Sequence, residues 1–240
     1  MSLHKAYSAL KGVQSAGPQI VQQAATALPN AVNQLSNLNN KNPKDTYSEK
    51  AKTKRLTPAE RKALYEKIIR VDHAGEFGAN EIYRGQLRFM KDEKDKELIQ
   101  HMWDQEKAHL AKFRDEFIPK HNARPTALLP VWRIAGYTLG ASTAFMSKNA
   151  AMACTAAVED SIVKHYNDQL RLLLEDLEKI EEKCPEHLEL MESIKKFRDE
   201  EQEHHDIGIE HGAEKTMNYK LVYGIIQAGC SAAIAVTEKI

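Results

Sequence analysis

Two parts of the chain carry the same chemical pattern, a Glu with a Tyr seven residues later and then, further on, a Glu-x-x-His motif. The members are Glu76, Tyr83, Glu106 and His109 in the first half, and Glu159, Tyr166, Glu201 and His204 in the second. Four carboxylates and two imidazoles are the ligand set of a di-iron or di-manganese centre in a four-helix bundle. The pattern therefore predicts a dinuclear metal site.

The spacing supports this prediction because it brings the carboxylates to one level. The helix from Glu76 to the polar run at residues 91–94 has about the same length as the helix that returns from this run to Glu106. The second half repeats this more loosely, with a break before Pro185. The motifs share helix faces with apolar residues such as Met102 and Phe197, where an unpaired charge would be costly. Solvated surface charge explains any one of these residues, but not all six ligands in register.

Carboxylates with two imidazoles suit iron or manganese better than zinc. The symmetry of the halves assigns Glu76 and His109 to one metal, Glu159 and His204 to the other, and Glu106 and Glu201 to the bridge. Outer hydrogen-bond partners should orient the imidazoles.

Asp72, Asp104 and Asp199 are candidates for these outer partners, although a surface role fits each equally well. Tyr83 and Tyr166 either donate to ligand carboxylates or simply pack. Three further histidines, His73, His165 and His205, lie outside the ligand spacing and by default are ordinary polar helix residues.

Composition limits the classes of function. The chain has 240 residues and a net charge of zero, which gives no broad basic field for nucleic acid. The three cysteines lie far apart without a C-x-x-C motif. They indicate ordinary thiols in a reducing compartment, neither a disulfide framework nor a thiolate metal site.

The pattern predicts an all-α fold built on a four-helix bundle in a single domain, residues 56–240. Thr57, Pro58 and Glu60 form a helix start, with an N-cap, a Pro at the first position and Glu three residues after the cap. The expected helices cover about 58–90, 95–117 (ending before Pro119), 148–182 and 186–214.

Two apolar segments flank the polar bundle. Residues 125–146 are too short and too interrupted by Pro and Gly for a membrane span; they fit either a segment lying in the membrane interface or a buried crossover between bundle helices. Residues 219–236 form a final helix that is apolar on most sides and needs cover from protein, a partner or lipid. Both suggest a hydrophobic substrate taken from a membrane.

Residues 1–55 are expected to be a disordered tail. Residues 1–44 contain no Asp or Glu and are rich in Ala, Ser, Gln and Asn, as in an organellar transit peptide. The absence of Arg before Arg55 departs from that pattern, and a polar tail with no address is the alternative.

Five segments together resemble the demethoxyubiquinone hydroxylase family of ubiquinone biosynthesis. They are Arg70–Asn80, Met102–His109, Ala157–Asp160, Phe197–Gly208 and Ile226–Cys230. The likeness covers about residues 58–240, and all six ligand positions carry the expected residue types. It implies a ferritin-like fold with additional apolar crossover and C-terminal helices, and a di-iron monooxygenase that uses O2 and NADH to hydroxylate a polyprenyl benzoquinone.

The resemblance also implies a location and partners. These are peripheral attachment to the matrix side of the mitochondrial inner membrane, a lipid-binding ubiquinone-biosynthesis protein and a larger biosynthetic complex. For His165 and Tyr166 it implies a catalytic role near the substrate or in electron relay.

Three other functions fit the same ligands: iron storage or ferroxidase activity, a non-catalytic quinone-binding scaffold in a biosynthetic complex, and another di-iron oxidase such as a quinol oxidase.

Overall fold

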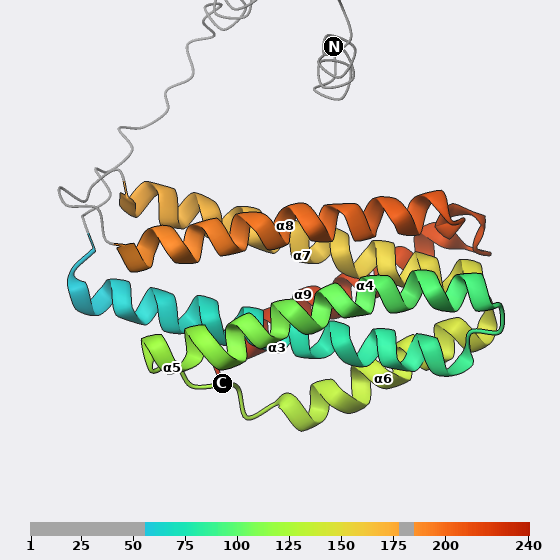
Figure 1. Ribbon diagram of the computed structural model, residues 1–240, viewed down its shortest axis with the longest axis horizontal. Helices are drawn as coiled ribbons and strands as arrows, with labels where there is room; N and C mark the ends of the chain where they lie inside the picture. Colours follow the sequence, from blue (N-terminus) through green and yellow to red (C-terminus); the bar gives the residue numbers. More distant parts are fainter. Residues whose placement is uncertain (1–55, 178–184) are drawn as a thin grey trace, which may run out of the picture. The chain divides into compact units, whose positions relative to one another are not determined.

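A computed structural model describes residues 56–177 and 185–240, which form an all-α ferritin-like bundle (Figure 1). The elements are α3 (Pro58–Phe89), α4 (Glu93–Ala111), the π-helical η1 (Lys112–Phe117), α5 (Ile118–His121), α6 (Leu129–Met146), α7 (Lys148–Leu177), α8 (Pro185–Glu210), the 3-10 helix η2 (Ala213–Lys215) and α9 (Tyr219–Thr237). Helices α3, α4, α7 and α8 form the bundle, while α6 packs on α3 and α9 packs on α7.

Helix α3 begins as the sequence predicts. The Thr57 side chain accepts a hydrogen bond from the Glu60 amide, and the Glu60 carboxylate accepts one from the Thr57 amide, with Pro58 at the first helical position. This capping box satisfies two backbone donors that the helix leaves without intrahelical partners.

Two apolar clusters fill the bundle and leave a layer between them. One contains Ile69, Phe113 and Leu173; the other contains Met102 and Met152. Along each bundle helix, the predicted metal ligands fall between the residues of these two clusters. The apolar clusters therefore fix the four helices on both sides of the polar layer.

Two predicted helix ends are wrong. The second helix does not stop before Pro119, because the chain continues through η1 into α5 with Pro119 in its first turn, where a missing N–H is tolerated. The fourth helix ends at Glu210 rather than Glu214, because Gly212 adopts a left-handed conformation with φ of 99°, the usual role of glycine after a helix.

Helix α6 has features of both structures predicted for residues 125–146, a segment lying in the membrane interface and a buried crossover. One face packs closely on α3: a Cβ built on Gly140 would lie 1.9 Å from the Ile82 carbonyl oxygen. The glycines that argued against a membrane span thus permit contact between two helix backbones. The other face is exposed, with Ile134 71% and Phe145 73% accessible.

By length and composition, helix α9 is long and apolar enough to cross a membrane. Of its most apolar 18-residue stretch, 11% is buried. It lies along α7 rather than apart from the bundle. Its inner face contributes Ile226 to a cluster with Val158 and Cys154, and Leu221 is exposed on its outer face.

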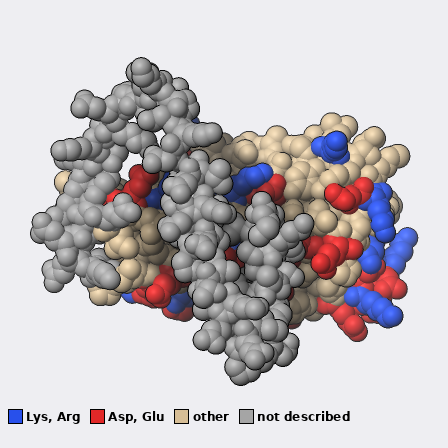
Figure 2. Space-filling model, turned by 90° about the horizontal axis from the view of Figure 1, so that it is seen from above, with Lys and Arg blue, Asp and Glu red and all other residues tan. Residues whose placement is uncertain are grey.

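Several expectations fall outside the described residues: the disordered or transit-peptide-like tail at 1–55, the end of the third helix at 178–182, and Cys184. The other two cysteines, Cys154 and Cys230, carry no disulfide. On the face seen in Figure 2, basic and acidic side chains of the described part intermingle without a broad area of one sign.

The contact between α3 and α6 gives a stability prediction. Gly140→Ala should lower the free energy of unfolding by about 1–3 kcal/mol, because the new methyl group would overlap the Ile82 carbonyl. Gly224→Ala in exposed α9 is the control: a Cβ there has nothing within 4 Å and should stabilise by about 0.5–1 kcal/mol. Denaturant unfolding measures both, and equal stability of the two variants would contradict the packing described.

Candidate metal centre

The six predicted ligands come together in the layer between the apolar clusters, one or two from each bundle helix. All are at most 1% exposed. They form two groups, Glu76, Glu106, His109 and Glu201, and then Glu106, Glu159, Glu201 and His204, in each of which one ligand atom per residue lies within 4.8 Å of the others. The groups share Glu106 and Glu201, the two residues predicted to bridge.

The imidazoles face the carboxylates through Nδ1. His109 Nδ1 lies 3.0 Å from Glu201 Oε1 and 3.5 Å from Glu76 Oε2. His204 Nδ1 lies 3.1 Å from both Glu106 Oε1 and Glu201 Oε2. Nδ1 is thus the ring atom that each histidine offers to a metal.

The tyrosines of the Glu-x6-Tyr repeat donate to carboxylates across the halves. Tyr83 donates to Glu159 Oε1 at 2.8 Å, and Tyr166 donates to Glu76 Oε1. The prediction that these tyrosines hydrogen-bond to ligand carboxylates is therefore confirmed. Each half therefore holds the single Glu of the other, an exchange that spacing along one helix does not reveal.

The outer nitrogen of each imidazole also meets a side chain from the opposite half. His109 Nε2 lies 2.8 Å from Glu200 Oε2, and His204 Nε2 lies 2.8 Å from Gln105 Oε1. With Nδ1 on a metal, each Nε2–H donates outward and fixes the ring orientation. Sequence reasoning missed both partners, although each directly precedes the Glu of a Glu-x-x-His motif.

A further support joins the two ligand-bearing helices of the first half. Asn80 donates through Nδ2 to the backbone carbonyl oxygens of Glu76 and Glu106, at 2.9 and 3.0 Å. Its Oδ1 accepts from Trp103 Nε1 at 3.0 Å. These bonds hold α3 and α4 at the level of the ligands, and sequence reasoning did not identify either residue.

The donor set fits bound cations. Glu76, Glu106 and Glu159 each have one buried carboxylate oxygen without a hydrogen-bond partner among the described residues. Burial, and then the nearby charge of Glu201, raise the pKa of Glu106 and Glu159 well above the usual range. Buried carboxylates with unpaired oxygens are costly unless paired or bound to metal, and carboxylate with imidazole suits iron or manganese.

Both imidazoles are held protonated without metal. Burial disfavours the charged ring, but the hydrogen bond to Glu201 and the nearby negative charge of Glu76 raise the pKa of His109 to about 12. Hydrogen bonds to Glu106 and Glu201 likewise raise the pKa of His204 to about 11 against the effect of burial. A metal must therefore displace protons from the histidines.

The two residues predicted to be catalytic lie in different surroundings. Tyr166 is buried in the site and bonded to Glu76. His165 is outside both ligand groups; its Nε2 lies 2.8 Å from Gln169 Nε2 and 3.7 Å from Asp72 Oδ1. The catalytic role of each stays a prediction.

The three Asp residues predicted to orient the ligand imidazoles also lie in different surroundings. Asp72 is buried and accepts from Gln169 at 2.6 Å, but within the described part of the chain no hydrogen bond joins it to a ligand imidazole. Asp104 bonds to Gln100 at 2.8 Å on the surface, and Asp199 pairs with Arg198 at 2.7 Å, also on the surface.

The other two histidines that the sequence analysis considered also lie outside the ligand groups. His205 contacts Asp206 at the surface, while His73 is buried with Nδ1 unpaired among the described residues.

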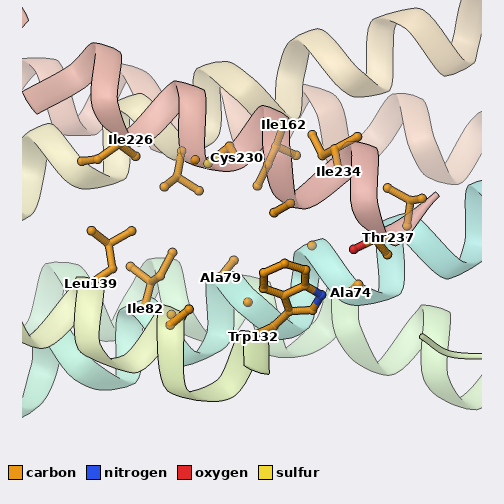
Figure 3. A pocket seen from close by; sticks show the side chains of 18 of the residues that line it. Ala74, Ala79, Ile82, Trp132, Leu139, Ile162, Ile226, Cys230, Ile234 and Thr237 are labelled. Carbon is orange, nitrogen blue, oxygen red and sulfur yellow. The ribbon is translucent and has the colours of Figure 1, made fainter. Parts of the chain in front are cut away.

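An apolar cavity of about 330 Å³ lies beside the bundle helices α3 and α7 (Figure 3). Its walls come from the bundle helices α3 and α7 and from α6 and α9, which carry the two apolar segments. Two of the wall residues, Gly75 of α3 and Val158 of α7, directly precede Glu76 and Glu159 in the chain. Volumes of this order and apolar linings are typical of sites for small hydrophobic ligands.

Comparisons with known proteins agree with the motifs. Residues 63–237 match the family described as ubiquinone biosynthesis protein COQ7. The chain is 53% identical to the Rattus norvegicus "NADPH-dependent 3-demethoxyubiquinone 3-hydroxylase, mitochondrial" over 74% of this chain and 79% of the rat protein. It is 42% identical to the Rhodospirillum rubrum "3-demethoxyubiquinol 3-hydroxylase" and 38% to the Saccharomyces cerevisiae "5-demethoxyubiquinone hydroxylase, mitochondrial", with the same coverages. The rat protein's name states NADPH, whereas the resemblance implied NADH.

The protonated histidines give a pH prediction. Metal ligands bind deprotonated, and the pKa values of His109 and His204, about 12 and about 11, lie above neutrality. The affinity of the metal-free protein for Co²⁺, a divalent probe that resists oxidation, should therefore rise steadily with pH between about 6 and 8. Calorimetric titrations in buffers of different ionisation enthalpy should also show proton release. A constant affinity without proton release would contradict this description.

Proposed function

The chain belongs to the ubiquinone biosynthesis protein COQ7 family, and we propose that it is a di-iron monooxygenase that hydroxylates the ring of a demethoxyubiquinone. Its family and named relatives identify it as a hydroxylase, an oxidoreductase of ubiquinone biosynthesis. The observation that carries the di-iron part is the buried layer of four carboxylates and two imidazoles in two groups with shared bridges.

The overall reaction requires a reductant. One atom of O2 enters the ring as a hydroxyl group, and the other is reduced to water by two electrons and a proton from a nicotinamide nucleotide together with a second proton from solvent. When bound, two iron ions supply the reduction and activation of O2, which side chains alone do not perform. The relatives' names favour NADPH as the source of electrons, and NADH is the alternative that the resemblance implied.

The chain's own residues hold the geometry for this chemistry. Tyr83 and Tyr166 fix one oxygen each of Glu159 and Glu76, leaving the second oxygen of each carboxylate for a metal. Glu200 and Gln105 fix the planes of the two ligand imidazoles. Such preorganisation avoids rearranging ligands during the reaction.

The apolar cavity is the proposed site for the quinone. A polyprenyl benzoquinone is an apolar molecule with a few ring oxygens, and the cavity walls are nearly all aliphatic side chains and glycines. Because Gly75 and Val158, the chain neighbours of the ligands Glu76 and Glu159, line the cavity, a ring bound there would lie near the metals.

The exposed apolar residues of α6 and α9 support attachment to a membrane. Ile134 and Phe145 on α6, and Leu221 on α9, are largely exposed on the helices that wall the cavity. A quinone with a long tail resides in the lipid, so this surface would let it enter the cavity from the bilayer. We place the protein peripherally on the matrix side of the mitochondrial inner membrane, supported by the mitochondrial names of its eukaryotic relatives.

The same surface is proposed to meet a lipid-binding ubiquinone-biosynthesis protein within a larger complex. Exposed apolar side chains on two neighbouring helices are typical of protein or membrane contact surfaces.

The function is tested on one purified sample. Iron is measured per chain, and then turnover of a demethoxyquinone is followed in air with NADPH and, separately, with NADH. We expect about two iron ions per chain and a hydroxylated product that requires a reductant.

Glu201→Ala should lose both metals and turnover, because it removes a shared bridge, while the exposed control Glu203→Ala should retain them. Iron uptake without quinone product would favour storage or ferroxidase activity. Quinone oxidation without hydroxylation would favour another oxidase. Rescue of a quinone-deficient strain by Glu201→Ala would favour a scaffold.

The membrane proposal has its own prediction. The double variant Ile134→Glu with Leu221→Glu should weaken sedimentation with anionic phospholipid vesicles by at least about tenfold, because two exposed apolar side chains no longer enter lipid. Leu172→Glu, a change at an exposed Leu of α7, is the control. Failure of the unmodified protein to bind vesicles would assign the surface to a protein partner instead.

A further inference from the structure

The cavity wall contains one polar atom that the protein leaves unsatisfied. Among its lining residues, the side chains that carry N, O or S are Trp132, Cys230 and Thr237. The indole Nε1 of Trp132 is buried and has no hydrogen-bond partner among the described residues.

An unpaired buried donor is unfavourable. Leaving one without an acceptor costs about 1–3 kcal/mol, and the N–H of a buried Trp usually finds a partner. The unpaired N–H of Trp132 lies at the wall of a cavity rather than in a packed core. An acceptor on a molecule bound in the cavity would remove the cost.

The contact between α3 and α6 sets the level of the indole. A Cβ built on Gly136 would lie 2.7 Å from the carbonyl oxygen of Gly78, and Gly140 meets Ile82 one turn further along both helices. The two helices therefore run parallel, so Trp132, one turn before Gly136, lies beside the turn of α3 that contains Glu76.

The view into the cavity agrees with this placement. The Trp132 ring lies between the helices, with Ala74 of α3 near its nitrogen-bearing edge and Ile234 and Thr237 of α9 on the facing wall (Figure 3). Gly75 of α3 also lines the cavity, and a Cβ there would meet nothing within 4 Å. The wall is thus not filled by a side chain at Gly75, in the same turn of α3 as Ala74.

We propose that the Trp132 indole N–H donates a hydrogen bond to a ring oxygen of the bound quinone and thereby fixes the depth and orientation of the ring in the cavity. The inference rests on the proposed function, since it concerns the same substrate. The chemistry that selects the quinone is simple: an apolar molecule that carries an oxygen acceptor satisfies both the walls and the indole. Trp132 acts as a positioning residue that favours oxygenated rings over hydrocarbons of the same shape.

The chain provides a direct reporter, because it contains two tryptophans, Trp103 and Trp132. In a Trp103→Phe variant, the emission comes from Trp132 alone. Titration with a demethoxybenzoquinone that carries a decyl tail should quench this emission saturably, since quinones quench indoles at contact. In the Trp132→Phe variant, emission from Trp103 should change little.

Affinity separates the hydrogen bond from shape. Trp132→Phe keeps an aromatic ring but removes the donor, so equilibrium dialysis should show the quinone binding about 3–10-fold more weakly, the loss of one hydrogen bond. A benzene ring with the same decyl tail and no oxygens is the matched probe, and its affinity should stay the same.

Equal affinity of the variant and the unmodified chain for the quinone would overturn the proposal, as would an equal loss for both probes. The outcome is independent of the iron and turnover test. Quenching and the affinity difference without hydroxylation would uphold the role of Trp132 and refute the enzyme function, whereas hydroxylation with an unchanged KM in Trp132→Phe would do the reverse.

Discussion

Burial of four carboxylates and two imidazoles in one layer is the constraint on which this structure depends. Such a layer is unfavourable unless cations compensate the negative charge. The helices that bear the layer are therefore held from both ends by apolar clusters, with Phe113 and Leu173 on one side and Met102 and Met152 on the other. The apolar packing supplies the stability that the polar layer does not.

The two halves of the bundle stabilise each other's ligands. Tyr83 reaches Glu159 and Tyr166 reaches Glu76, while Glu200 and Gln105 reach the imidazoles of the opposite half. The repeat extends one layer further out, where Gln86 bonds to Thr155 and Gln169 bonds to Asp72. Neither half holds a complete ligand geometry alone, so the site forms only when the halves dock.

Much of the site was predictable from the sequence because its signals are periodic. The position of Glu76 seven residues before Tyr83 identifies one inward face, and the Glu-x-x-His motifs identify two more. Which carboxylate each Tyr reaches was not predictable, because that depends on the docking of helices distant in sequence. The contacts of Gln105 and Glu200 with the ligand imidazoles were not predictable for the same reason.

The fold was predictable to a similar depth. The four bundle helices follow from periodicity and from the Thr57 cap. One error arose because a residue has two permitted roles, since Pro119 can end a helix or begin one; a Gly such as Gly140 likewise can weaken a helix or admit a neighbour. Only the packing of α5 and α6 decides between these roles.

The outer partners of the two imidazoles differ in a way that the six ligands do not. His109 is backed by a carboxylate, Glu200, and His204 by an amide, Gln105. A charged acceptor makes an imidazole a stronger electron donor than a neutral amide does. Metals held by this mirrored ligand set would therefore have an electron-rich side and an electron-poor side, and this polarity would come from a single amide-for-carboxylate difference between the halves.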